Sequence, residues 1–452
     1  MEGYLAVFGF LIIITVIGLL IWGKVNPIVA MVMIPVIGAL VAGFGFEDIS
    51  DFFGAGTAQV MDVAIMFIFA IIFFGIMNDV GLFNPIIKGM IIITRGNVVV
   101  VTIVTIIIGA IAHLDGAGAT TYLLTIPALI GLYKQLHMSP MLLLMLATFS
   151  LGFMNVTPWG GPVGRISSVL GYDNPAALWY PLIPWQIGAF FLAIGFAVIL
   201  GLREKKRIEK RIENGEIEAN QNINSRELAE DFNKRQLEEQ AASAEKRAEH
   251  PVIIWINAGV LIVVLALMLF DIAPPGLAFM IGLAIALPLN YHSVNDQMGR
   301  IRAHAPAALM MASIILAAGL FLGVITDSGM LDALALSIVG ILPEAVGPYI
   351  HVLVAFFGIP LDIIMSTDAY YFGIFPVVES VASNFGVASE STAYMLLLGS
   401  TISQGFLSPA LWLGVGLAGV QIGRFMKYAF FWFWAFAIVG LILGWILGIF
   451  TI

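Results

Sequence analysis

Long runs of apolar residues, separated by short polar stretches, fill most of this chain. A helix that crosses a membrane needs roughly 20 consecutive apolar residues. By that measure the pattern predicts single spans and two interrupted spans, in which a cluster of polar residues, prolines and glycines breaks the apolar run. The predicted spans are 4–23, 27–45, 61–78, 139–171 (interrupted), 180–202, 252–271, 274–289, 305–325, 391–426 (interrupted) and 428–450.

Two further apolar stretches, 97–133 and 346–386, are each too long for one span and contain polar residues near the middle. We interpret each as a helical hairpin that enters and leaves the membrane on the same side. The alternative is that each stretch forms two ordinary spans.

The distribution of Lys and Arg along the chain favours re-entrant hairpins over pairs of ordinary spans. The segment 203–250 holds 11 Lys/Arg and 12 Asp/Glu and has no apolar stripe, so we expect a solvated connector. The positive-inside rule places this connector in the cytoplasm. Counting crossings outward from it then puts 19 of the 20 Lys/Arg on the cytoplasmic side, and Arg165 is the exception. The predicted external loops near 46–60 and 327–345 carry acidic residues and no Lys/Arg.

The two halves of the chain share local patterns at a nearly constant offset. Asp115 matches Asp362 (offset 247), Pro127 matches Pro376 (249), and Pro158 matches Pro409 (251). Each half contains an odd number of crossings, five, so the second half is inverted relative to the first. We therefore predict an all-α integral membrane protein: an inverted repeat of five spans plus one re-entrant hairpin each, with two interrupted helices. The boundaries are 1–202 for the first repeat, 203–250 for the cytoplasmic connector and 251–452 for the second repeat.

Inverted repeats with broken helices place the transported substrate near the midplane of the membrane. Pro158, Gly160, Gly161 and Pro162 break the first interrupted span, and Gly405 and Pro409 break the second. Non-helical backbone at that depth is tolerated only where it is buried or lines a cavity. The alternative, a simple kink in a packed helix, fits poorly with so dense a run of breakers.

Polar residues gather at these breaks. A charged group inside the membrane costs at least ~2.5 kcal/mol on insertion scales, so such residues are functional candidates. The predicted substrate-binding residues are Thr120, Thr121, Asn155, Thr157, Gly160, Gly161, Arg165, Ser366, Thr367, Ser403, Gln404 and Ser408; the predicted metal ligands are Asp115 and Asp368; the candidates for proton coupling are His113, Asp115, Asp362 and Asp368. Taken singly, each Ser or Thr is more simply explained by a bond to its own helix. For the histidine, the simpler explanation is a structural role. Arg165 has its own alternative, a side chain that reaches out to the membrane surface.

Composition removes other classes of function. Cysteine is absent, which excludes disulfides and thiolate chemistry, and the first apolar run has no cleavage site, so we expect it to remain as a helix. The sequence contains no His-Glu-x-x-His motif, no nucleophile paired with a base and no nucleotide-binding loop. We therefore expect neither an enzyme nor an ATP-driven pump. Outside the connector no basic patch is present that would bind nucleic acid.

The hairpin Asp115-Gly-Ala-Gly-Ala-Thr-Thr-Tyr122, the break Asn155-Val-Thr-Pro-Trp-Gly-Gly-Pro162 and the segment Ser408-Pro-Ala-Leu-Trp412 resemble the citrate–divalent metal:proton symporter family (CitMHS), within the wider ion transporter superfamily. The resemblance implies a multi-pass carrier in the plasma membrane that imports citrate as a metal complex together with protons. It also implies elevator-type alternating access and a homodimer with a scaffold part and a moving part. The hairpin tips read Gly-Ala-Thr-Thr and Ser-Thr-Asp, where the superfamily often has Ser-Asn-Thr, which favours a coupling ion other than sodium.

The charges at the predicted site agree with a metal complex. Free citrate carries three negative charges and would require several Arg or Lys, whereas these breaks offer three aspartates and one arginine. A divalent cation of the Mg or Ca class binds carboxylate oxygens and reduces the net charge of citrate to one. We expect no permanently bound cofactor, since the cation travels with the substrate. The alternative is a sodium- or proton-coupled carrier of another organic acid without metal.

The predicted topology can be tested with single cysteines, because the chain has none of its own. We expect Asp51→Cys to react with a membrane-impermeant thiol reagent in intact cells. Asn214→Cys, in the connector, is expected to react only after permeabilisation. Strong labelling of Asn214→Cys in intact cells would contradict the topology.

Overall fold

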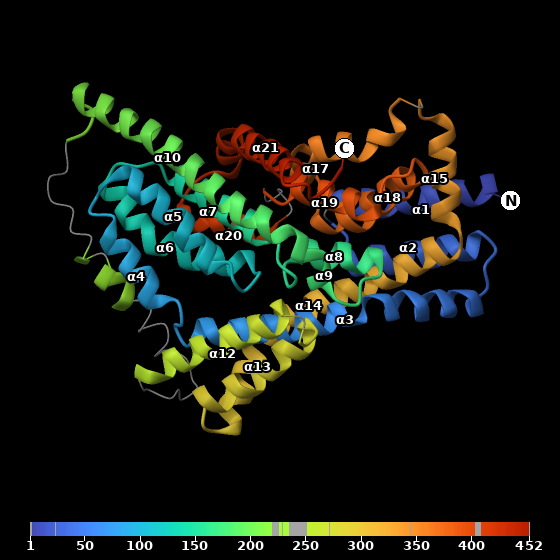
Figure 1. Cartoon of the computed structure of the whole chain (residues 1–452), viewed down its shortest axis with the longest axis horizontal. Helices are drawn as coiled ribbons and strands as arrows, with labels where there is room; N and C mark the ends of the chain where they lie inside the picture. The colour runs from blue at the N-terminus through green and yellow to red at the C-terminus, as the bar shows by residue number, and fades with distance from the viewer. Residues whose placement is uncertain are drawn as a thin grey trace.

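The structure is a computed structural model that describes residues 2–22, 24–218, 226–227, 229–234, 251–270, 272–343, 345–402 and 408–451. Its described part is helical throughout (Figure 1). The first half contains α1 (Glu2–Trp22), α2 (Pro27–Val41), α3 (Phe46–Asp79), α4 (Asn84–Ile93), α5 (Val98–Ala112), α6 (Gly118–Gln135), α7 (Pro140–Met154), α8 (Gly161–Leu170), α9 (Pro175–Trp179), η1 (Tyr180–Leu182) and α10 (Ile183–Glu213).

The second half, like the first, combines long and short helical elements. It contains α12 (Pro251–Leu269), α13 (Pro275–Asn290), α14 (Val294–Asp327), α15 (Met330–Ile341), η2 (Gly347–Tyr349), α16 (Ile350–Phe356), α17 (Gly358–Ile364), the π-helix η3 (Ala369–Ile374), α18 (Phe375–Asn384), α19 (Ser389–Ser400), α20 (Pro409–Ala418) and α21 (Ile422–Ile446). The third helix of each half, α3 and α14, has 34 residues.

Six helices of the described part are long and apolar enough to cross a membrane, and the bent pair of α16 and α17 is either a broken seventh span or a re-entrant segment. The fold therefore confirms an all-α protein with several candidate spans. Two predicted loops are wrong, however. Residues 46–60 form the first turns of α3, whose start is fixed by a hydrogen bond from Gly45 N to Asp48 Oδ2 at 2.7 Å, and residues 330–341 form α15.

The polar interruptions lie where the sequence predicts them. Residues 113–117 separate the two arms of the first hairpin, α5 and α6. In the second hairpin the first arm bends by 60° between α16 and α17, and residues 365–368 lead into η3 and α18. The first interrupted span consists of α7 and α8, with 155–160 between them, and the second of α19 and α20. Gly405 in the second break lies outside the described residues.

One buried hydrogen bond occurs in the same place in both halves. Tyr122 of α6 bonds Thr148 of α7 at 2.9 Å, and Tyr371 of η3 bonds Ser400 of α19 at 2.8 Å. Each bond ties the second arm of a hairpin to the interrupted span that follows it. The two pairs are 249 and 252 residues apart, close to the offset found in the sequence. The inverted repeat itself stays a prediction.

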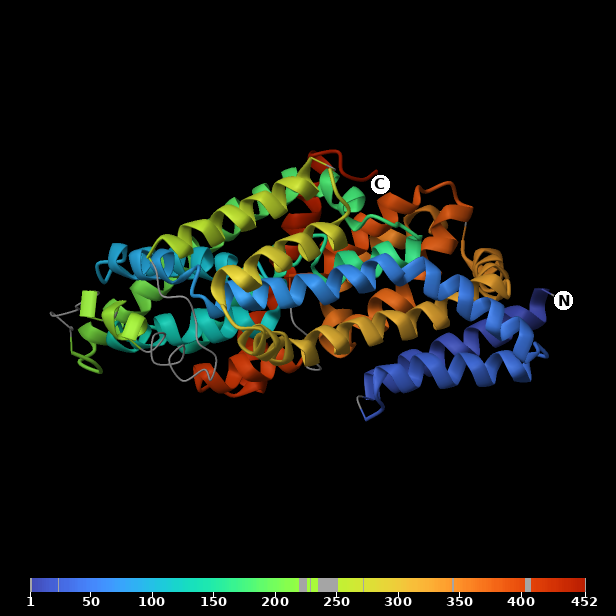
Figure 2. The ribbon, with the colours of Figure 1, turned by 90° about the horizontal axis from the view of Figure 1, so that it is seen from below.

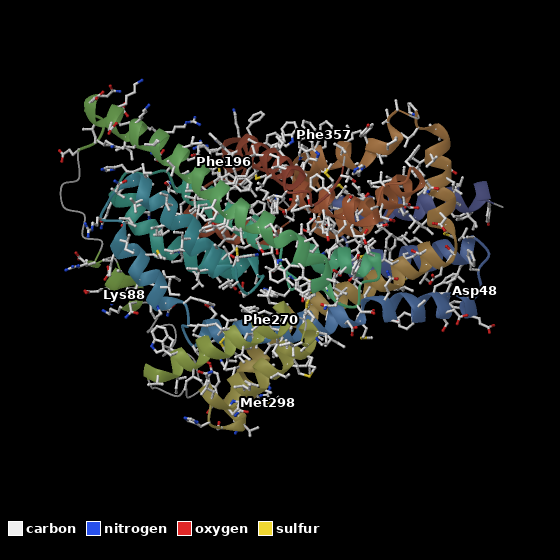
Figure 3. The ribbon with its side chains drawn as sticks, viewed as in Figure 1. Asp48, Lys88, Phe196, Phe270, Met298 and Phe357 are labelled. Carbon is white, nitrogen blue, oxygen red and sulfur yellow. The ribbon has the colours of Figure 1, made fainter. Side chains whose placement is uncertain are left out.

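Helices α3 and α14 pack along each other, with α2 and α13 at their sides, while the two hairpins and the interrupted spans form the neighbouring body (Figures 1 and 2). Helix α8 contacts α3, α14 and η3, so it lies where the two bodies meet. Asp48 and Lys88 lie at opposite ends of the molecule (Figure 3).

Glycines let α3 and α14 approach closely. A Cβ at Gly323 would lie 2.0 Å from the carbonyl oxygen of Phe52, and one at Gly56 would lie 2.0 Å from that of Gly319. Small residues at helix contacts are typical of membrane proteins because they allow backbones to touch.

We expect Gly323→Ala to lower the melting temperature of the detergent-purified protein, because the added methyl group forces α14 away from α3. Gly54→Ala is the matched control, since a Cβ there meets no atom within 4 Å. It is expected to leave stability unchanged or slightly higher, because Ala favours helix over Gly by roughly 1 kcal/mol. Equal thermal unfolding of the two variants would contradict the proposed close contact.

Candidate functional site

A polar cavity of about 270 Å³ lies between the two halves of the chain. The first half contributes residues of its hairpin tip and of the α7–α8 break: His113, Gly116, Gly118, Asn155, Gly161, Pro162 and Arg165. The second half contributes Met365, Ser366, Thr367, Asp368, Ser408 and Ala410. Both hairpin tips and both interrupted spans therefore meet at one cavity. Eight of the predicted site residues line it.

Arg165 and Asp368 form a buried ion pair across this cavity. The Arg165 Nε lies 2.8 Å and one terminal nitrogen 2.7 Å from the same oxygen, Asp368 Oδ1. Their side chains are only 7% and 10% exposed. Arg165 therefore does not extend to the membrane surface, and the alternative of a snorkelling side chain is wrong. The pair joins α8 of the first half to the segment before η3 of the second.

His113 ends α5 and is oriented by the second arm of its hairpin. Its Nδ1 lies 2.7 Å from the Thr121 hydroxyl, which also donates to the Ala117 carbonyl at 3.2 Å. The ring also interacts with the Asn155 side chain. Even so, His113 Nε2 and Asn155 Oδ1 are buried without a hydrogen-bond partner of good geometry. Both side chains nevertheless line the polar cavity.

Four helix N-termini border the cavity. Gly118 opens α6, Gly161 opens α8, and Ser408 precedes α20. Ser366 accepts a hydrogen bond from Ala369 N at 3.1 Å and so caps η3, while its own hydroxyl hydrogen remains able to donate. A helix N-terminus carries about half a positive charge and unbonded N–H groups, which favour anions.

The predicted residues Asp115 and Thr120 stabilise the hairpin rather than line the cavity. Asp115 Oδ1 accepts from Ala117 N at 2.8 Å, and Thr120 bonds the same carboxylate. Gly160 sets the path of the break, since a Cβ there would lie 2.0 Å from the carbonyl oxygen of Asn155. Asp362 is buried within α17.

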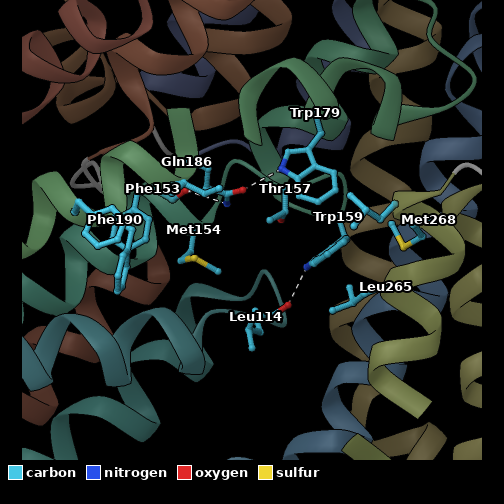
Figure 4. Close-up of a pocket in the computed structure, with 13 residues that line it drawn as sticks. Leu114, Phe153, Met154, Thr157, Trp159, Trp179, Gln186, Phe190, Leu265 and Met268 are labelled. Atoms are coloured by element: carbon cyan, nitrogen blue, oxygen red, sulfur yellow. Dashed lines mark hydrogen bonds between the residues drawn. The ribbon is translucent and has the colours of Figure 1, made fainter. Parts of the chain in front are cut away.

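Thr157 faces a second, apolar cavity behind the break, shown in Figure 4. Ser403 and Gln404 were predicted to bind substrate, but they lie outside the described residues.

The predicted metal ligands do not come together as a metal site. Asp368 is engaged by Arg165, and Asp115 is engaged by its own hairpin. The described residues contain no group of three or more His, Asp or Glu side chains that could hold a metal ion.

Two features were missed by the sequence analysis. Met311 of α14 lines the cavity, with its sulfur 4.0 Å from an Arg165 nitrogen, but nothing distinguishes it from other apolar residues of a span. Asp79, at the end of α3, bonds His304 at 2.7 Å and Arg300 at 3.3 Å, both from α14. The sequence signal for this cluster is Asp79 itself, a single acidic residue at the end of an apolar run.

These features define a multi-pass membrane transporter, with a polar cavity formed by broken helices inside an apolar helical body. The family model CitMHS, described as a citrate transporter, matches residues 17–399. The chain belongs to this family of transporters and not to an enzyme family.

Curated relatives match over nearly the full length. A citrate transporter of Bacillus subtilis (strain 168) is 33% identical over 449 residues, covering 98% of this chain and 99% of the relative. A Mg(2+)/citrate complex secondary transporter of the same organism is 33% identical over 429 residues, covering 95% of each. Among solved structures, the Alcanivorax borkumensis YdaH transporter is similar in fold, with a TM-score of 0.54, 15% identity and 87% of each chain covered.

The ion pair can be tested by removing its charges singly and together. Arg165→Gln and Asp368→Asn each leave a buried charge without its partner, which typically costs roughly 3–5 kcal/mol. We expect both single variants to lower the melting temperature strongly and the neutral double variant, Arg165→Gln with Asp368→Asn, to recover most of the loss. Additive losses in the double variant would show that the two side chains do not depend on each other.

Proposed function

We propose that this protein is a secondary carrier that imports citrate as a complex with a divalent metal ion, in symport with protons. One observation supports the proposal most strongly. The polar cavity is bordered by four helix N-termini, yet its titratable side chains are one paired arginine, one paired aspartate and one histidine. It suits a large polar anion of low net charge.

The charge balance favours the metal complex over free citrate. Arg165 and Asp368 neutralise each other, so a trivalent anion would meet only partial helix charges and neutral hydroxyls. A citrate that carries a divalent cation has a net charge of one, which is within the reach of such groups. The relative named a Mg(2+)/citrate complex secondary transporter adds support for a metal in the cargo.

The side chains at the breaks have suitable roles in holding such a complex. The hydroxyls of Ser366, Thr367 and Ser408 can donate hydrogen bonds to carboxylate oxygens. The amide group of Asn155 can donate as well, and its Oδ1 can accept from the citrate hydroxyl or from water on the metal. We propose that citrate itself supplies most metal ligands, because the lining side chains do not form a metal site.

Proton coupling is assigned to His113 and the buried aspartates Asp115, Asp362 and Asp368. Asp368 has the most direct route to coupling. A proton on its carboxylate would weaken the pair with Arg165, and the freed guanidinium could then bind a citrate carboxylate in a bidentate manner. Proton and citrate binding would thereby favour each other.

The architecture suits elevator-type movement of the hairpins and interrupted spans against α3 and α14. The predicted inverted repeat provides the symmetry that alternating access requires. We further propose a homodimer, as the family resemblance implies, with the segment 203–250 in the cytoplasm.

The test is uptake of labelled citrate into proteoliposomes, with the metal and the proton gradient varied separately. We expect uptake to require Mg²⁺ or another divalent cation, to rise with an inward proton gradient and to stop when a chelator is in excess. Citrate uptake that persists under chelation would replace this proposal with a metal-free organic-acid carrier. Stimulation of uptake by a sodium gradient instead of a proton gradient would show that sodium, and not the proton, is the coupling ion.

Site variants in the same assay separate binding from folding. Asn155→Ala and Thr367→Ala each remove a hydrogen bond to a charged ligand, typically roughly 1.5–3 kcal/mol, so the half-saturating concentration is expected to rise at least about tenfold. Ser337→Ala on α15 is the control, because its hydroxyl bonds the Ala333 carbonyl and the residue does not line the cavity. Wild-type affinity in the Asn155 and Thr367 variants would exclude them from the site.

A further inference from the structure

A second cavity, of about 520 Å³, lies on the reverse side of the two backbone segments that line the polar cavity. Its wall includes Leu114 of the first hairpin tip and Thr157 and Trp159 of the α7–α8 break. The remaining lining residues come from the end of α7, from α9 and α10, and from α12 across the gap (Figure 4). A volume within roughly 300–1,000 Å³ is typical of sites that hold a small organic ligand.

The polar groups of this wall bond one another and leave an apolar surface. Trp159 donates to the Leu114 carbonyl at 2.8 Å, and Trp179 donates to Gln186 Oε1 at 3.0 Å. Gln186 in turn donates to the Phe153 carbonyl at 3.3 Å. Thr157 is the one further polar side chain among the lining residues, and none of them is charged. A cavity of this composition does not retain water, since water requires two to four polar partners.

The mouth of the cavity continues the lipid-facing surface. Ile187 and Phe191 of α10 and Leu269 of α12 are 56%, 65% and 47% exposed, and both helices are candidate membrane spans. In a bilayer these side chains contact hydrocarbon. The deep wall, by contrast, contains residues that are almost fully buried: Phe153, Trp159 and Met268.

We propose that this cavity binds an acyl chain of a bilayer lipid, which enters between α10 and α12 and reaches Trp159 behind the hairpin tip. Hydrocarbon is the solvent at the mouth, and the dry, uncharged wall matches it. Because no lining residue is charged, the site recognises the chain and not the headgroup. An occupant here contacts Leu114, next to His113, and Thr157, two residues from Asn155, so it packs against the backbone that shapes the polar cavity.

Photolabelling tests this assignment without any transport measurement, so its result is independent of the proposed function. The protein is reconstituted with phosphatidylcholine that carries a diazirine at the end of one acyl chain, irradiated, and mapped by peptide mass spectrometry. We expect adducts on the deep residues Phe153, Trp159 or Met268 as well as on the rim. Adducts confined to the outward-facing rim would overturn the proposal.

Variants in which a larger side chain fills the cavity can be compared with a matched variant outside it. Leu265→Trp, and the smaller Leu265→Phe, are expected to reduce deep labelling several-fold while rim labelling at Phe191 persists. Ile262→Trp is the control, because it lies on the same helix, is 66% exposed and does not line the cavity. Undiminished deep labelling in folded Leu265 variants would contradict the site. Phosphatidylglycerol with the same diazirine-bearing chain is expected to label the deep residues to the same extent. Deep labelling that requires the anionic headgroup would contradict the proposal that the cavity recognises the acyl chain.

Discussion

The ion pair between Arg165 and Asp368 is the interaction on which the arrangement of the site depends. Two charges inside an apolar helical body are costly unless each satisfies the other. The pair can form only if α8 of the first half meets the segment before η3 of the second half. It therefore holds the first interrupted span and the tip of the second hairpin at one cavity, and it leaves that cavity nearly neutral.

The backbone at the breaks imposes a second constraint. Unbonded N–H and C=O groups are not tolerated in contact with lipid, so each break must be enclosed by protein or open to a polar cavity. The structure does both. Gly116 adopts a φ of +70° beside the Trp159 carbonyl, and the Trp159 ring donates to Leu114, which binds the first hairpin tip to the α7–α8 break. The starts of α6, α8 and α20 border this cavity, and helix N-termini favour anions.

Much of this architecture could be predicted from the sequence, because lipid imposes simple rules on length and on polar breaks. The hairpin of 97–133, the α7–α8 break and the convergence of Asn155, Arg165 and Thr367 on one cavity all follow from such rules. Residues 46–60 were predicted as a loop because Asp48 and Asp51 interrupt the apolar run, yet these acids lie in and near the first turn of α3, where a helix favours them. The partner of Arg165 could not be predicted, since three buried aspartates were equally available and only packing selects Asp368.

In the proposed function, the neutral pair also gives a physical reason why cargo, metal and proton travel together. Moving a site through the membrane becomes costly when it carries net charge, because burial in a low-dielectric medium penalises each uncompensated ion. Free citrate in this cavity would leave about three negative charges, and a divalent cation in the complex removes two of them. One proton on Asp368 would leave Arg165 to balance the last charge. In this account the metal and the proton are requirements of charge neutrality during transit, and the single arginine of the cavity sets how many charges must be removed by other means.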